Sequence, residues 1–368
     1  MNITMEEARR LRDQYGTPLL VVSRSRIMEK FQILKDYLPR IGMYYAVKAN
    51  PNKEILKIID SCNSYYDVCS DWEIETVMEL GVPGERMIHT HPMKKPENIQ
   101  FAIERGIKWF VFDNEWELSK FLPYKDKINL LMRLSFPNPD CMVNLSYKFG
   151  VDPVSALPLA LRAREMGLKV KGLCFHVGSQ SPNPYKHVEA IIECRRLFNL
   201  MTLEGFQLEV VDIGGGFPVE YTDGIMPFKS FFEPIQEACS RYFGSVRVIA
   251  EPGRFVVGDG VDLILSVVGK SRRSDIWWYY LDDGVYGSFS GKVFDHCDYR
   301  MRSEKEGPRE QCIVAGPTCD SFDIIYHNST LPSLEIGDML LVPSMGAYTS
   351  CSSTSFNGIL PARTVVVD

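Results

Sequence analysis

Three absences narrow the class of protein. The apolar stretches, such as residues 128–134, are far too short to cross a bilayer. The 41 basic residues against 47 acidic ones give a net charge of -6, so no basic surface for nucleic acid is expected. Residues 1–12 are charged and lack the apolar core of a signal peptide. We therefore predict a cytoplasmic protein that binds neither nucleic acid nor membrane.

Metal and redox motifs are also missing. The ten cysteines include no Cys-x-x-Cys pair and the six histidines form no His-Glu-x-x-His motif, so neither a metal site nor a redox-active pair is predicted. Most cysteines of a cytosolic chain should be buried free thiols. What is present is ordinary for a globular protein: 45% apolar and 24% charged residues in a chain of 368, long enough for one large domain and a smaller one.

Short β-rich apolar runs alternate with amphipathic segments up to about residue 260. The amphipathic segments carry apolar residues at helical spacing, and Asp71 and Asn114 are predicted N-caps. Strands separated by helices pair in parallel, and eight such units predict a (β/α)8 barrel of the TIM type. A doubly wound open sheet stays the alternative, because strand order cannot be read from one sequence. The eight predicted strands are residues 43–47, 65–69, 86–90, 109–113, 128–134, 172–176, 209–213 and 246–250.

The pattern changes after about residue 261. Strand-like runs are joined there by turn-rich segments, which predicts a β-rich C-terminal domain, a β-barrel or sandwich. The strand-like run at 17–22 precedes the barrel and is expected to pair with that domain. We predict a barrel of residues 23–260 and a β domain of residues 1–22 plus 261–368. The runs in question are residues 263–268, 277–281, 311–315, 339–343 and 363–367.

Polar residues stand at the ends of the predicted barrel strands, where barrels of this kind carry their active residues. A lysine in an apolar setting becomes nucleophilic, as imine formation requires, and Lys48 is flanked by apolar neighbours. Taken alone, Lys48 is better explained as a strand-end lysine that reaches solvent. The residues at strand ends are Lys48, Asp67, His89, Arg133, His176, Gly214 to Gly216, and Glu251 with Arg254.

A glycine-rich turn, Asp212-Ile-Gly-Gly-Gly-Phe-Pro218, follows the seventh predicted strand. Three adjacent glycines let backbone N–H groups close around a phosphate, although a tight strand-to-helix turn is an even alternative. Glu251 could pair with a protonated ring nitrogen and Arg254 with phosphate, or the two could close a Pro-Gly turn. His176 could stack on a flat cofactor ring, or be a hydrogen-bonded core histidine.

A second candidate segment, Gly316-Pro-Thr-Cys-Asp-Ser-Phe-Asp323, lies in the predicted β domain. Cys319 could act as a proton donor if its loop is accessible. Asp320 could bind a cationic substrate tail. From spacing alone, a turn that carries a buried thiol is the better explanation.

Seven motifs in order closely resemble the fold-type III pyridoxal-phosphate decarboxylases, and within them the ornithine decarboxylase group. The resemblance runs from Tyr-Gly-Thr-Pro near residue 15 to Phe-Asn-Gly near residue 356. The motifs are Tyr45-Ala-Val-Lys-Ala-Asn50, Phe175-His-Val-Gly-Ser179, Asp212-Ile-Gly-Gly-Gly-Phe-Pro218, Glu251-Pro-Gly-Arg254, Asp283-Gly-Val-Tyr-Gly-Ser-Phe289, Gly316-Pro-Thr-Cys-Asp320 and Met345-Gly-Ala-Tyr-Thr349.

The resemblance implies pyridoxal 5'-phosphate as cofactor, bound by the barrel, and a homodimer with two shared active sites. It makes Lys48 the Schiff-base lysine and Cys319, from the partner subunit, the proton donor. It implies that His176 stacks on the ring and that Glu251 pairs with its nitrogen. The implied cofactor contacts are Lys48, Asp67, Arg133, His176, Ser179, Gly214, Gly215, Gly216, Glu251, Gly253, Arg254 and Tyr348. The implied substrate contacts are Asp283, Cys319, Asp320 and Tyr348.

The implied reaction is decarboxylation of a small basic amino acid, L-ornithine or L-lysine. The two differ by one methylene, worth about 1–3 kcal/mol of discrimination, so dual activity is an alternative. Diaminopimelate or a secondary-metabolite precursor is a rival substrate, and a non-catalytic homologue that binds other proteins is a rival function. Amino-acid racemases of the same fold usually place an arginine at the ring nitrogen, and Glu251 argues against that reading. Asp282 departs from the family's Asn-Asp, and either contacts substrate or caps a turn.

Overall fold

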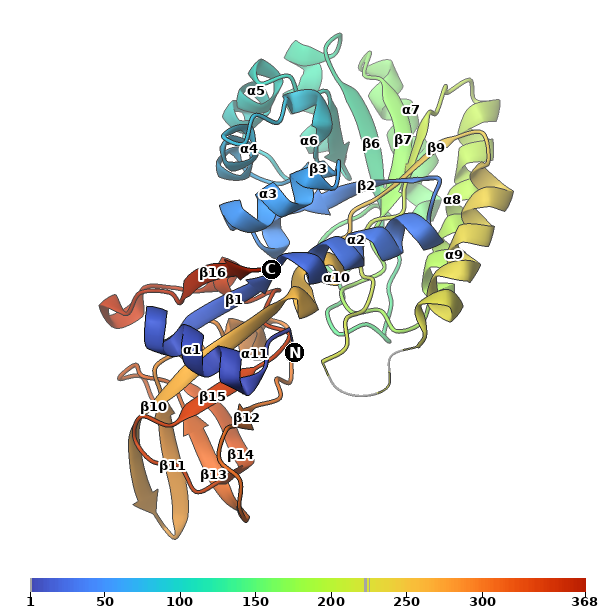
Figure 1. Ribbon diagram of the computed structural model, residues 1–368. Coiled ribbons are helices and arrows are strands. Elements are labelled where there is room, and N and C mark those ends of the chain that lie inside the picture. Colours follow the sequence, from blue (N-terminus) through green and yellow to red (C-terminus); the bar gives the residue numbers. More distant parts are fainter. Residues whose placement is uncertain (1, 222–223, 225) are drawn as a thin grey trace. The chain divides into compact units, whose positions relative to one another are not determined.

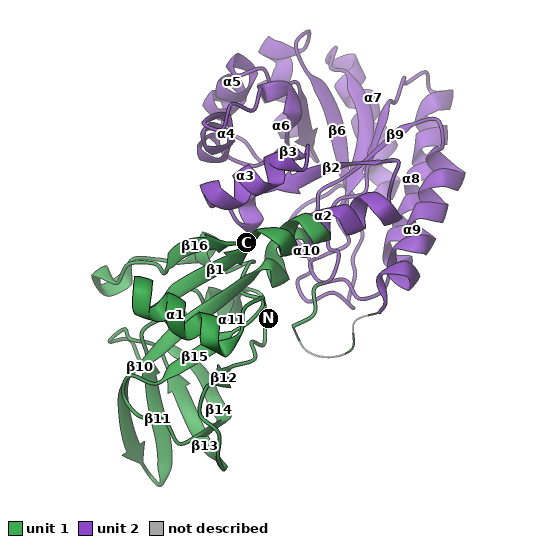
Figure 2. Cartoon of the chain, viewed as in Figure 1, with its two compact units in different colours: residues 1–29, 219–224, 256–368 green, residues 30–218, 225–255 purple. Residues whose placement is uncertain are grey.

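The computed structural model describes residues 2–221, 224 and 226–368 (Figure 1). The chain forms two compact units (Figure 2). Unit 1 consists of Met1–Glu29, Val219–Gly224 and Val256–Asp368, and unit 2 of Lys30–Pro218 and Ile225–Phe255. The predicted domain limits at residues 22/23 and 260/261 stay a prediction. Among the described residues, no helix combines the length and the apolar character needed to cross a membrane.

Unit 2 contains a closed barrel of eight parallel strands, paired in chain order from β2 to β9 with β9 next to β2. The predicted (β/α)8 fold is therefore confirmed, and the open-sheet alternative is wrong. The strands are β2 (Ile41–Ala46), β3 (Tyr65–Val68), β4 (Met87–His89), β5 (Trp109–Phe112), β6 (Asn129–Leu134), β7 (Val170–Phe175), β8 (Val210–Asp212) and β9 (Arg247–Ala250).

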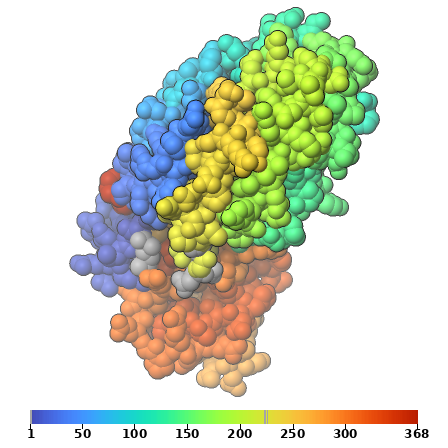
Figure 3. Space-filling model, turned by 90° about the vertical axis from the view of Figure 1, so that its right-hand side faces the viewer, coloured from blue at the N-terminus to red at the C-terminus, as the bar shows by residue number. Residues whose placement is uncertain are grey.

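Helices connect successive strands of the barrel. The side chains of α8 and α9, lime to yellow in Figure 3, cover one side of it. Asn114 caps α6 as predicted, because its side chain accepts a hydrogen bond from Glu117 N. The cap of α4 is Ser70, one residue before the predicted Asp71. The connecting helices are α3 (Lys53–Ser61), α4 (Asp71–Met78), α5 (Pro96–Glu104), α6 (Glu115–Phe121), α7 (Pro153–Glu165), α8 (Tyr185–Leu203) and α9 (Phe228–Phe243).

An apolar layer fills the barrel interior. Seven of the eight strands contribute one buried residue each to this layer, and Tyr65 of the remaining strand stacks on Tyr44 with ring centroids 4.9 Å apart. Side chains alternate along a strand, so the residue two positions further toward the carboxyl end also points inward. The members of this apolar layer are Tyr44, Ile88, Val111, Leu131, Cys174, Val210 and Ile249.

Unit 1 is built around one eight-stranded sheet with the order β12-β15-β10-β11-β13-β14. Strand β1 pairs with β10, and β16 pairs with β1. The segment at 17–22 pairs with this sheet as predicted, since β1 (Leu19–Ser23) runs antiparallel to β10 and parallel to β16. The other strands are β10 (Val261–Arg273), β11 (Ile276–Leu281), β12 (Arg302–Ser303), β13 (Arg309–Ala315), β14 (Ile324–Pro332), β15 (Met339–Val342) and β16 (Arg363–Val367).

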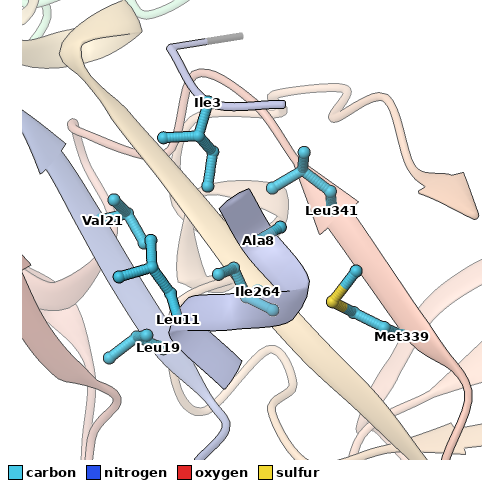
Figure 4. Packing of buried hydrophobic residues seen from close by; sticks show 8 residues of the cluster. All are labelled: Ile3, Ala8, Leu11, Leu19, Val21, Ile264, Met339 and Leu341. Atoms are coloured by element: carbon cyan, nitrogen blue, oxygen red, sulfur yellow. The ribbon is translucent and has the colours of Figure 1, made fainter. Parts of the chain in front are cut away.

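Helix α1 (Met5–Tyr15) covers this sheet with its apolar face. It begins with a capping box, in which Thr4 and Glu7 bond each other's backbone N–H groups. Ala8 and Leu11 pack against side chains from three strands (Figure 4). The N-terminal segment is thus part of the core of unit 1. Two short helices, α10 (Arg254–Val257) and α11 (Ser290–Phe294), lie in segments where the sequence predicted only turns.

Candidate active site

A polar layer lies at the carboxyl ends of the barrel strands, above the apolar layer. Each member stands two residues beyond an inward-pointing residue, so strand alternation alone directs it into the barrel. His89 does not belong to this layer: its ring stacks on Phe110, which packs on Phe121 of α6, so His89 faces the helices. The prediction that His89 lies with the other strand-end residues in the active site is therefore wrong. The members of the polar layer are Asp67, Thr90, Asp113, Arg133, His176, Asp212 and Glu251.

Lys48 reaches the polar layer from η1 (Val47–Ala49), the single turn that ends β2. Its Nζ lies 3.1 Å from Asp67 Oδ2, and the side chain of Asp67 is fully buried. Thr90 Oγ1 donates to the other oxygen of the same carboxylate. The setting of Lys48 is therefore polar, whereas the sequence predicted an apolar one. The side chain is 39% exposed, so an aldehyde can approach it.

His176 is held as a neutral imidazole. Its Nδ1 accepts a hydrogen bond of 3.0 Å from Gly178 N, which places the ring proton on Nε2. Burial lowers the pKa of His176 well below its usual value, and the positive charges of Arg133 and Lys48 lower it further. A neutral ring at this position suits stacking on a flat aromatic group better than ion pairing.

The glycine turn after β8 leaves two backbone donors unused. Gly214 and Gly216 have φ of +65° and +92°, and a Cβ at either position would meet a carbonyl oxygen at 2.2 or 2.3 Å. The N–H groups of Gly215 and Gly216 donate to no described residue, whereas Gly216 O accepts from Ser181 N. The segment that contacts Gly216 also carries Ser179, whose Oγ accepts from Arg254 at 3.1 Å. Two free N–H groups, a hydroxyl and a guanidinium form a cradle for a phosphate.

Glu251 follows β9 and is tied to the glycine turn, because its N–H donates to Gly214 O at 2.7 Å. Its carboxyl group neighbours that of Asp212, whose Oδ2 is buried and has no hydrogen-bond partner among the described residues. Burial raises the pKa of Glu251 well above its usual value, and the negative charges of Asp212 and Asp67 raise it further. A base of this kind suits a partner that carries an N–H.

Two further predicted cofactor residues have different surroundings. A Cβ at Gly253 would lie 2.9 Å from the Cβ of Ala49 and 3.2 Å from that of Ala46, so this glycine lets the turn before α10 pack against η1. Arg133 lies with its guanidinium 5.6 Å from the ring centre of Phe149. The first contact places Gly253 beside the turn that carries Lys48. The cofactor roles of both residues stay a prediction.

A second group of reactive side chains belongs to unit 1. Cys319 is exposed, and its N–H and Sγ both lie within hydrogen-bond distance of Asn357 Oδ1, at 3.0 and 3.1 Å. The interpretation that spacing alone favoured, a turn that carries a buried thiol, is therefore wrong. Asp320 accepts a hydrogen bond from Tyr286 OH, which lowers the pKa of this carboxyl group. The ring of Tyr286 stacks on Phe356 at 4.7 Å.

Three acidic residues near the Cys319 loop have different hydrogen-bond partners. Asp283 is buried: its Oδ1 accepts from Gly284 N and Ser288 N, while Oδ2 has no hydrogen-bond partner in the described chain. Burial raises the pKa of Asp283 to about 6. Asp282 accepts a hydrogen bond from Ser266 N of β10 at 2.9 Å. Its two interpretations, a substrate contact or a turn cap, stay predictions. Asp323 anchors the Cys319 loop through Thr318 and Val285 N.

The structure thus brings most predicted cofactor residues together in unit 2, whereas Asp283, Cys319, Asp320 and Tyr348 belong to unit 1. In unit 1, Tyr348 follows Ala347, whose carbonyl accepts from Tyr221 OH at 2.6 Å.

Sequence reasoning missed Thr90, Asp212, Tyr286 and Asn357. The last three lie inside or beside motifs that had been singled out. No group of three or more His, Cys, Asp or Glu within the described ranges could hold a metal ion.

The sequence matches a family described as pyridoxal-dependent decarboxylase, pyridoxal binding domain, over residues 24–258. The lysine/ornithine decarboxylase of Selenomonas ruminantium is 38% identical over 100% of this chain and 93% of that protein. Mouse ornithine decarboxylase is 34% identical over 87% and 74% of the two chains. A lysine/ornithine decarboxylase from Vibrio vulnificus, solved with cadaverine, superposes with a TM-score of 0.94 at 41% identity over the whole of both chains.

Pyridoxal phosphate requires a phosphate cradle, an amine for its aldehyde and a partner for its ring nitrogen. The glycine-turn cradle, Lys48 and Glu251 supply these three features within one unit, so the residues present fit the cofactor. The match covers more than half of the chain, and the fold and the identities with the relatives agree with it. The chain belongs to the pyridoxal-dependent decarboxylase family.

Proposed function

We propose that the chain decarboxylates L-ornithine, L-lysine or both, giving putrescine or cadaverine for polyamine biosynthesis. The observation that carries this choice is the acidic character of the Cys319 group. Asp283 presents a buried oxygen that has no hydrogen-bond partner among the described residues, and Asp320 is held ionised by Tyr286. A distal ammonium group would satisfy both carboxylates, whereas the distal carboxylate of diaminopimelate would be repelled by them.

The barrel residues have separate tasks in this proposal. Lys48 would hold the cofactor covalently and is the amine that the substrate would replace. The N–H groups of Gly215 and Gly216, with Ser179 and Arg254, hold the phosphate. Arg133 and Gly253 line the cofactor beside Lys48, and Tyr348 completes the phosphate contacts.

When bound, pyridoxal phosphate supplies an electron sink for the carbon that loses carbon dioxide. Glu251 holds the proton at the ring nitrogen that strengthens this sink, and neutral His176 covers one face of the ring without adding charge. Asp67 keeps the Lys48 ammonium within 3.1 Å of its carboxylate, so the lysine stays beside the cofactor after it has been displaced. Cys319 delivers a proton to the carbon after carbon dioxide has left.

We further propose that the enzyme is a cytoplasmic homodimer in which Cys319, Asp320 and Asp283 of one subunit complete the barrel site of its partner. The exposure of Cys319 and of the neighbouring Phe322, whose side chain is 61% exposed, supports a surface that a partner covers. Asp323 is 2% exposed and anchors this loop through Thr318 and Val285 N. The resemblance to the family also implies that Asp323 and Lys148 pair across the dimer interface.

Mixing two inactive variants tests the shared site. Lys48→Ala lacks the covalent lysine and Cys319→Ala lacks the donor, so each homodimer should form little amine product. After subunit exchange, half of the dimers are mixed, and each mixed dimer has one site with both residues. We expect about a quarter of the wild-type rate of amine formation. No recovery, with exchange verified by two affinity tags, would contradict the shared site.

The tail-binding role of Asp320 predicts a selective effect on KM. Asp320→Asn keeps an oxygen that accepts from Tyr286 OH but removes the charge. We expect the KM for ornithine or lysine to rise about 10- to 100-fold with little change in kcat, the usual range for a lost charged hydrogen bond. Steady-state kinetics measure this, with Asp275→Asn as the control, since that side chain is 95% exposed. A pure kcat effect would argue against tail binding.

A panel assay for carbon dioxide release from ornithine, lysine, arginine and diaminopimelate tests the substrate class. Release from ornithine or lysine is the expected result. Release from diaminopimelate or another diamino acid alone would replace the proposed substrate. A protein that binds the cofactor but releases no carbon dioxide from any member would favour the alternative, a non-catalytic homologue that acts by protein binding.

A further inference from the structure

Two acidic side chains meet at the ends of β8 and β9. Asp212 is paired with Ile249 in the parallel ladder, so Glu251 stands two residues beyond its partner on the same face. The backbone fixes this arrangement on both sides, because Ile213 N donates to Ile249 O at 2.9 Å and Glu251 N donates to Gly214 O at 2.7 Å. Asp212 has no exposed area.

The hydrogen bonds of Asp212 require a proton on its neighbour. Its Oδ1 accepts from Gly214 N at 2.8 Å, which favours an ionised carboxylate. Its Oδ2 is buried, and no N–H, amide or hydroxyl group of the described chain donates to it. The neighbouring side chain on this face is Glu251, and a carboxyl group can donate a hydrogen bond only when it carries a proton. The missing donor is therefore protonated Glu251.

The surrounding charges keep this proton on the pair. Asp67 adds a second negative charge and favours the protonated form of Glu251, whereas Lys48 opposes it. Arg133 favours the ionised form of Asp212. His176 is neutral, so it adds no positive charge. The other titratable groups of the described chain that interact with the pair are the thiols of Cys174 and Cys194 and the phenol of Tyr44.

We propose that Asp212 is a positioning residue that holds one proton on Glu251 until the cofactor binds, and then keeps the ring nitrogen protonated. When the nitrogen arrives beside Glu251, the shared proton either moves to it or, if the nitrogen is already protonated, leaves to solvent. Glu251 then accepts from the ring N–H, and the remaining charge on Asp212 strengthens that bond. This inference rests on the proposed role of Glu251 at the ring nitrogen.

Asp212→Asn removes the need for the shared proton. The amide oxygen can still accept from Gly214 N, and the amide nitrogen can donate to an ionised Glu251. Calorimetric titration of the cofactor-free protein with pyridoxal phosphate, in buffers of different ionisation enthalpy, counts the protons exchanged. At one pH, we expect the wild type to release about one proton more per cofactor, or take up about one fewer, than Asp212→Asn. Equal counts would overturn the proposal.

A control and a second variant complete the experiment. Asp113→Asn removes a charge from the same polar layer and keeps the acceptor for Gly150 N, so its count should equal that of the wild type. Asp212→Ser also removes the charge that holds the shared proton and leaves Glu251 for the ring nitrogen, so its count should equal that of Asp212→Asn. If Asp212→Asn does not fold, a wild-type count in Asp212→Ser overturns the proposal by itself. Failure of the wild type to bind pyridoxal phosphate would refute the proposed function instead, and the two failures are thus distinguishable.

Discussion

Lys48→Ala is expected to lower turnover by more than about a thousandfold and to remove the visible absorbance of the lysine-bound cofactor. Lys48 is the amine that stands in the polar layer, 3.1 Å from a buried carboxylate and close to the phosphate cradle. Without it, pyridoxal phosphate can bind through its phosphate but cannot be held covalently. The measurements are the carbon dioxide assay and the absorbance spectrum of the protein after dialysis against the cofactor.

Lys53→Ala provides the matched control for this variant. Lys53 begins α3 only five positions further along the chain, but it pairs with Glu79 at the surface with its side chain 57% exposed. This exposed pair should contribute little, so activity and spectrum should stay near those of the wild type. Borohydride reduction followed by peptide mapping locates the bound cofactor. A label on any lysine other than Lys48, or substantial turnover by Lys48→Ala, would refute the assignment.

The barrel could be predicted from the sequence because its signals are local. Each strand is a short apolar run, each helix has apolar residues at helical spacing, and Asn114 marks a helix start by its own side chain. At the start of α4 the sequence offers two cap residues in a row. Ser70 caps that helix, and Asp71 takes its first position, where a negative charge is also favourable. Local propensity does not decide between such neighbours.

The direction of single side chains is the part of the site that local signals left open. His89 and Thr90 both follow an apolar run, but strand alternation sends His89 outward to Phe110 and Thr90 inward to Asp67. The phase of the alternation becomes visible only when a neighbouring strand fixes which residues face the barrel interior. Asp212 was overlooked for a related reason, since its chemistry depends on Glu251, which is 39 positions away in the chain.

Lys94→Met is expected to lower the free energy of unfolding by about 3–5 kcal/mol, a large loss for a single substitution. The side chains of Lys94 and Glu117 are 1% and 0% exposed, and Nζ lies 3.1 Å from Oε1. The same ammonium donates to Val111 O at 2.7 Å and to His91 O at 2.6 Å, so it joins β5, α6 and the loop after β4. Methionine fills similar volume but leaves a buried carboxylate and two carbonyls without their donor.

Chemical unfolding followed by circular dichroism, at one saturating concentration of cofactor, measures this loss. Lys108→Met is the control, because Lys108 is 58% exposed and lies 3.8 Å from Glu85, and its effect should stay below about 1 kcal/mol. The double variant Lys94→Met with Glu117→Gln should recover part of the loss, since it no longer buries a carboxylate that has lost the Lys94 ammonium. Lys120 also bonds Glu117, at 2.6 Å from Oε2, so the recovery should be incomplete. If Lys94→Met were as stable as Lys108→Met, the buried ion pair would not hold this side of the barrel together.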